Sequence, residues 1–114
     1  METQTPIACD MTAIPPEQRQ SHLTTSRNLF AKIQQSRELE NGYEFRLANE
    51  PRLVLELAEF ISLEKLCCPF LNFAIEVEQE GGPVWLRLTG RAGVKAFIRE
   101  EINGLLGVAI NWTA

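Results

Sequence analysis

Two adjacent cysteines stand in the segment LEKLCCPFLNF, residues 63–73, with a glutamate one helical turn before them and a proline directly behind. The chain has three cysteines, and the remaining one, Cys9, lies near the N-terminus. An odd number of cysteines, two of them adjacent in sequence, does not suit a disulfide framework, so we expect free thiols in the reducing cytoplasm. Metal ligation and thiol chemistry are therefore the functions that these residues could serve.

A soft divalent ion, such as zinc or the mercuric ion, takes three or four thiolate or imidazole ligands in a roughly tetrahedral array. Cys9, Cys67, Cys68 and the single histidine, His22, supply that number. The spacing is not a recognised zinc motif, because adjacent cysteines tend to diverge whereas a C-x-x-C pair shares one ion easily. Pro69 disfavours helical geometry at Cys68, which could turn both sulfurs to one side.

Arg19 and Glu64 are the charged residues that we expect to support these ligands. Glu64 and the negative end of its helix should both raise the pKa of a thiol at Cys67. This field favours a bound cation and opposes a reactive thiolate, unless Arg19, His22 or a metal ion supplies positive charge. We therefore do not predict an enzyme, although thiol redox chemistry stays open as a third alternative.

A simpler interpretation is that these residues only build the core. Free cysteine is often buried as a small hydrophobe, and an inward-facing histidine is commonly a hydrogen-bonded core residue. Arg19 and Glu64 could form an ion pair across two helices. The chain would then be a non-enzymatic interaction module, forming a homodimer through the outward-facing Trp85 or through the apolar tail that contains Trp112.

Length and composition predict one globular domain over residues 1–114, with a loose terminus over 1–5 and a tail or edge strand over 108–114. The chain has a net charge of −4 and a pI near 5. Because this negative charge repels the phosphate groups of nucleic acids, no nucleic-acid partner is expected. No apolar stretch approaches the roughly 18 residues of a membrane span, and the N-terminus has no apolar signal core. We expect a cytoplasmic protein without a membrane partner.

Hydrophobic periodicity and turn residues predict eight elements. Asn41-Gly42 marks a tight hairpin, because both positions of such a turn favour positive φ. The expected elements are a strand over 6–11, a helix over 16–35, a hairpin over 37–47, a helix from 51 to 68, a hairpin over 73–88 and a helix over 94–105.

The order β-α-β-β-α-β-β-α predicts an α+β fold, in which an antiparallel sheet carries helices on one face. Its first six elements match a ferredoxin-like core, which an extra strand and a C-terminal helix would extend. In that arrangement the end of the first strand lies beside the start of the strand that follows the second helix. Cys9 should therefore lie next to Cys67 and Cys68.

The segment from Glu64 to Phe73 resembles a family of small bacterial proteins without an assigned function, whose signature is E-x-x-C-C-P-F-x-x-F. The N-terminal Cys9, then Arg19 and His22, and the turn over residues 88–90 are also similar to that family. Some of its relatives are associated with loci for resistance to mercury and other heavy metals. The resemblance implies a thiophilic metal and assigns no activity.

Overall fold

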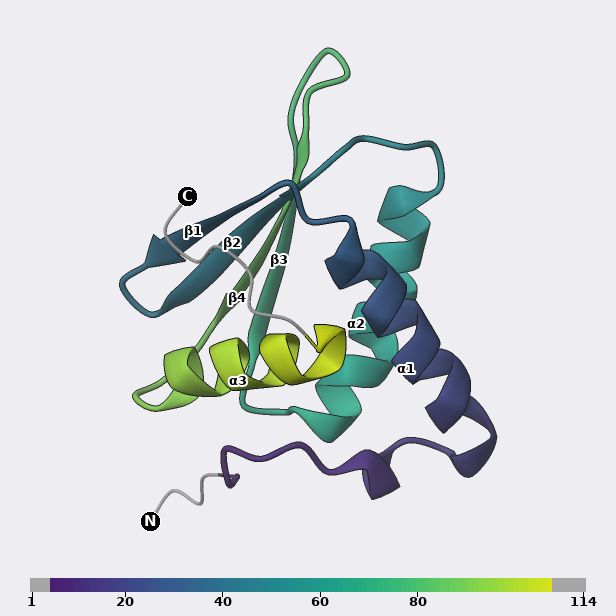
Figure 1. Cartoon of the computed structure of the whole chain (residues 1–114), viewed down its shortest axis with the longest axis vertical. Coiled ribbons are helices and arrows are strands. Elements are labelled where there is room, and N and C mark those ends of the chain that lie inside the picture. The colour runs from purple at the N-terminus through teal and green to yellow at the C-terminus, as the bar shows by residue number, and fades with distance from the viewer. Residues whose placement is uncertain (1–4, 108–114) are drawn as a thin grey trace.

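The computed structural model describes residues 5–107 of the chain, which form helices and an antiparallel sheet (Figure 1). The expected tail over 108–114, including Trp112, lies outside these residues. The elements are the 3₁₀ helix η1 (Met11–Ala13), α1 (Pro16–Ala31), β1 (Gln35–Leu39), β2 (Gly42–Leu47), α2 (Leu53–Cys67), β3 (Asn72–Val77), β4 (Val84–Thr89) and α3 (Val94–Leu106).

The helices begin and end where local chemistry favours it. Pro16 opens α1 at a position whose N–H needs no partner, and Glu17 lies near the positive end of the helix dipole. This helix stops four residues before the expected end, because the chain from Gln35 pairs with β2 as a strand. Gly93 and Gly107 bound α3 with φ of 96° and 73°, a conformation that favours glycine.

Both expected hairpins are confirmed, but the reason given for the first one is wrong. The chain turns at residues 40–41, and neither Asn41 nor Gly42 has positive φ. Gly42 is instead required by close packing, because a Cβ atom there would overlap the carbonyl oxygen of Leu88 in the neighbouring strand β4.

The sheet has the order β1-β2-β4-β3, and all neighbouring strands are antiparallel. The α+β class with an antiparallel sheet is thus confirmed, while the ferredoxin-like order is not. The expected strand over residues 6–11 is absent, and β4 takes the central position that it would have filled. The side chain of Asp10 accepts a hydrogen bond from the N–H of Thr12 and opens η1, so the backbone turns instead of extending.

The three helices cover one face of the sheet (Figure 1). Phe30 of α1 contacts Phe45 of β2, and Phe60 of α2 contacts Phe73 of β3, both edge to face. Lys95 of α3 forms an ion pair with Glu38 of β1 on the same side. The core lies between these layers, and the two cysteines at the end of α2 belong to its edge.

The opposite face of the sheet is polar, and Trp85 does not form the exposed patch that we expected. Its side chain faces outward but is only 6% exposed, because the guanidinium of Arg37 lies 4.5 Å from the centre of the ring. Glu44 accepts hydrogen bonds from Arg37 and from Arg87, which also pairs with Glu76. The low exposure of Trp85 does not support homodimerisation through this residue. A homodimer through another surface remains a prediction. Within residues 5–107, no helix is long and apolar enough to cross a membrane.

Candidate metal centre

Cys9 reaches the other cysteines through a loop. The backbone N–H of Asp10 donates a hydrogen bond of 3.0 Å to the carbonyl of Cys67, which joins the N-terminal segment to the last residue of α2. The expected convergence of the three cysteines is therefore found, although the strand pairing that was expected to produce it is absent.

Arg19 holds this N-terminal segment in place. Its Nε donates to the carbonyls of Met11 and Ile14, both at 2.9 Å, and its Nη2 donates to the carbonyl of Thr12 at 3.3 Å. The ion pair with Glu64 that the simpler interpretation allowed is not found: these three carbonyls engage the guanidinium, and Glu64 pairs with His22. Arg19 thus positions the loop that carries Cys9.

The end of α2 presents two sulfurs to one side. Cys67 is the last helical residue, while Cys68 has left the helix with φ −128° and ψ 64°, as Pro69 requires. The Cys67 and Cys68 sulfurs lie 3.7 Å apart, and both are within 4.8 Å of the Cys9 sulfur. All three cysteines are unpaired thiols, and Cys67 and Cys68 are buried.

Glu64 and His22 complete the cluster. One carboxylate oxygen of Glu64 lies 2.8 Å from Nε2 of His22 and 3.3 Å from the sulfur of Cys67. The other oxygen lies 3.7 Å from the sulfur of Cys68. His22 is 3% exposed and stacks on Phe60, and its Nδ1 has no hydrogen-bond partner among the described residues.

This arrangement separates the three thiols by their pKa values. Burial, with the hydrogen bond and charge of Cys67, raises the pKa of Cys9 to about 12. Hydrogen bonding to Cys67 and burial raise the pKa of Cys68 far above its usual range. The hydrogen bond from Cys68, together with one from His22, lowers the pKa of Cys67 to about 6 against burial and the charge of Glu64. One thiolate is thus held by two neighbouring donors.

The charge of His22 matches that thiolate. Burial lowers the pKa of the imidazole, but hydrogen bonds and charge from Cys67 and Glu64 outweigh it and raise the pKa to about 9. His22 supplies the positive charge that a thiolate at a helix C-terminus requires. The sequence identified the residue, but not that it pairs with Glu64.

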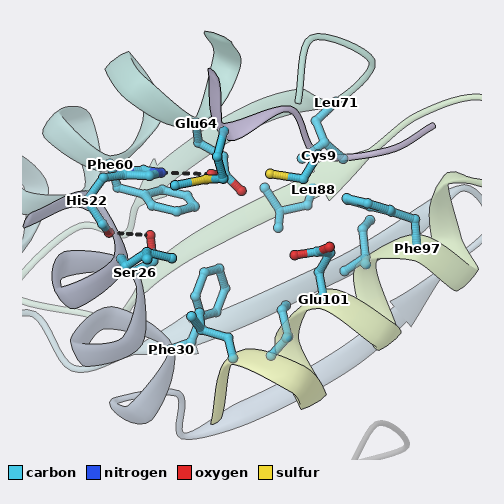
Figure 2. A pocket seen from close by; sticks show the side chains of 15 residues that line it. Cys9, His22, Ser26, Phe30, Phe60, Glu64, Leu71, Leu88, Phe97 and Glu101 are labelled. Carbon is cyan, nitrogen blue, oxygen red and sulfur yellow. Dashed lines mark hydrogen bonds and ion pairs between the residues drawn. The ribbon is translucent and has the colours of Figure 1, made fainter. Parts of the chain in front are cut away.

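A cavity of about 260 Å³ opens beside the cluster. Cys9, His22 and Glu64 line one side of it, and the remaining wall is mostly apolar (Figure 2). Figure 2 shows the Cys9 sulfur pointing toward Glu64, and the carboxyl group of Glu101 in α3 pointing into the same space. Of the three cysteines, Cys9 lines this cavity, while Cys67 and Cys68 do not.

Glu101 was not proposed as a site residue from the sequence. It falls in the apolar stripe of α3, between Ile98 and Ile102, and a glutamate in such a stripe is a signal that could have identified it. Partial burial, with the charges of Glu64 and Glu100, raises the pKa of its carboxyl group.

Comparison of the chain with protein-family models, with curated proteins and with solved structures finds no match. The resemblance in the Glu64–Phe73 segment therefore stays a prediction, and the function is argued from the site itself.

Proposed function

We propose that the chain binds a soft metal ion through the sulfurs of Cys9, Cys67 and Cys68. The observation that carries the proposal is the approach of three thiols from two distant segments to within 4.8 Å of one another. Zinc–thiolate bonds are about 2.3 Å long, so two sulfurs in a tetrahedral site lie about 3.8 Å apart. The 3.7 Å between the Cys67 and Cys68 sulfurs agrees with that edge.

The charges around the sulfurs support a cation. A carboxylate contacts two of the three thiols, and the C-terminus of α2 adds partial negative charge at Cys67. Partial burial of this carboxylate beside the sulfurs has a cost in free energy, which the pair with His22 offsets in part and a bound cation would offset further. A metal ion offsets the repulsion between the thiolates and Glu64.

His22 has a supporting role in this proposal, although it was predicted as a ligand. The sulfurs of the three cysteines form one potential ligand set, while His22 joins Glu64 and Cys67 in another. Its Nε2 is engaged by Glu64 at 2.8 Å. His22 therefore orients the carboxylate and balances the charge, and the fourth coordination position is left to solvent or to an incoming ligand.

The test measures metal bound to reduced protein that has been treated with a chelator. Dialysis against zinc, cadmium or mercuric ions, followed by elemental analysis, should give about one ion per chain. Cys9→Ser, Cys67→Ser and Cys68→Ser should each lower the affinity by about tenfold or more. Glu64→Gln should weaken binding, while Glu59→Gln, an exposed change on the same helix, should not.

Circular dichroism establishes that each variant is folded. Wild-type protein that binds less than about a tenth of an equivalent of all three ions would contradict the proposal. Full binding by a folded variant that lacks both Cys67 and Cys68 would contradict it equally.

Thiol redox chemistry is a second candidate, favoured by the lowered pKa of Cys67 and by Cys68 at 3.7 Å. The thiolate of Cys67 would attack a disulfide substrate, breaking its S–S bond, releasing one thiol and forming a mixed disulfide. A neighbouring cysteine would then displace the second thiol and leave an intramolecular disulfide, so that the substrate is reduced and the protein oxidised. Rapid alkylation of one thiol in metal-free protein near pH 6 supports this candidate. Uniformly slow labelling of all three cysteines removes it.

A further inference from the structure

The cavity beside the cysteines has an apolar interior that the metal site does not use. Aromatic rings of Phe30, Phe60 and Phe97 line it from the three helices, and Ile98 and Ile102 of α3 add to the same wall. Enclosed pockets with mostly apolar walls and a few polar groups are the usual form of sites for small organic ligands.

The charged side chains that line the cavity are two glutamates and His22. Glu64 and Glu101 both line it, and neither lysine nor arginine occurs among the described lining residues. His22 is already paired with Glu64 at 2.8 Å. Within residues 5–107, the carboxyl group of Glu101 forms no hydrogen bond or ion pair, so it is available to a ligand.

We infer that this cavity binds a small hydrophobic cation, with the cationic group at Glu101 and the apolar body among the aromatic rings. The carboxyl group of Glu101 enters the cavity from α3 and faces the side formed by Cys9 and Glu64 (Figure 2). A cation there meets negative charge from two glutamates and the π faces of phenylalanine side chains, which attract positive charge. Anions are repelled by the same carboxylates.

The size of the cavity limits the ligand. An apolar cavity of about 150 Å³ holds a benzene ring, so one of about 260 Å³ has room for about ten non-hydrogen atoms. A phenyl ring with a two-carbon arm and an ammonium group has that size. Primary or secondary arylalkylamines are therefore the chemical class that we assign to the site.

The test compares three probes of nearly equal size on metal-free, reduced protein: 2-phenylethylammonium, the neutral 2-phenylethanol and the anion phenylacetate. Titrations followed by amide NMR shifts should show that affinity decreases from the cation to the neutral alcohol to the anion. The cation should bind about tenfold more tightly than the alcohol at low ionic strength, and added salt should reduce this preference. Shifts should concentrate on residues that line the cavity.

Glu101→Gln should abolish the preference for the cation, while leaving the affinity for 2-phenylethanol nearly unchanged. Glu100→Gln is the matched control, because this neighbouring glutamate does not line the cavity, and it should keep the preference. Equal affinity for cation and alcohol in the wild type would overturn the inference, as would a Glu101→Gln protein that still selects the cation. Binding of zinc, measured on the same variants, tests the metal proposal separately because Glu101 is not among the proposed ligands.

Discussion

Binding of a divalent ion at the three cysteines should release about two protons near pH 7.5, although three thiolates hold the ion. Cys9, with a pKa of about 12, and Cys68, whose pKa is also raised, carry their protons at this pH and must lose them. Cys67, with its pKa lowered to about 6, is already ionised. His22, with a pKa of about 9, should keep its proton and its contact with Glu64.

The proton count also sets the pH dependence of the affinity. Protons are products of binding, so a rise in pH favours the complex. Two released protons predict that the dissociation constant falls about 100-fold per pH unit between about pH 6.5 and 8.5. Below about pH 6, Cys67 is protonated as well, and the dependence should steepen to about 1,000-fold per unit.

Calorimetry with zinc in buffers of different ionisation enthalpy measures the count directly, since the slope of observed enthalpy against buffer enthalpy is the number of protons transferred. Cys68→Ser should lower the count to about one, because only Cys9 then contributes a proton. Cys67→Ser is the informative contrast. It removes a ligand that carries no proton, so affinity should fall while the count stays near two.

A wild-type count below about one would show that the sulfurs do not bind the ion as thiolates. Release of about three protons would refute the assigned protonation states. It could arise in two ways, and the thiolate absorbance of the metal-free protein distinguishes them. If no thiolate is present near neutral pH, Cys67 begins protonated. If a thiolate is present, His22 has given up its proton and become a ligand.

Three further measurements test other parts of the structure. Gly42→Ala should destabilise the fold by about 1–3 kcal/mol in urea titrations, because the added Cβ would overlap a backbone carbonyl. Gly104→Ala in α3 has free space for its Cβ and should stabilise the fold by about 0.5–1 kcal/mol. Equal effects of the two changes would contradict the close packing at Gly42. Arg19→Gln should cost about 1.5–3 kcal/mol and weaken zinc binding, while the exposed Arg52→Gln should do neither. In metal-free protein, the alkylation rate of Cys67 should reach half its maximum near pH 6, and this midpoint should rise to the ordinary thiol range when the protein is unfolded. A midpoint near pH 9 in the folded protein would show that the thiolate of Cys67 is not stabilised.

Much of the secondary structure could be predicted because the signals are local. Alternation in β2 and β4, the proline after Cys68 and the glycines around α3 each act within a few residues. The segment over residues 6–11 was misassigned as a strand because its short apolar run has the composition of one. The competing signal is the side chain of Asp10, which accepts from the N–H of Thr12 and caps a 3₁₀ turn.

The candidate site was predictable by residue type, but of its contacts only the approach of Cys9 to Cys67 and Cys68 was expected, and from a strand pairing that is absent. Adjacent cysteines, one histidine and one glutamate on inward helix faces identified the cluster, since polar residues in apolar stripes are unusual. The pairing of His22 with Glu64 depends on how α1 and α2 pack, which no local pattern contains. Arg19 has the same limitation: its sequence position placed it near the cluster, but its hydrogen bonds go to a loop whose shape was unknown.

That loop makes the three proposed ligands unequal. Cys67 and Cys68 are fixed by α2 and by the hydrogen bond from the Cys68 N–H to the Glu64 carbonyl, at 2.8 Å. Cys9 is joined to them through one backbone hydrogen bond and through the loop contacts of Arg19, and it is the only one of the three that is not buried. Since Cys9 also lines the cavity, an ion that entered there would meet this sulfur first. Metal affinity should therefore be governed by how firmly the loop is held, as much as by the sulfur atoms themselves.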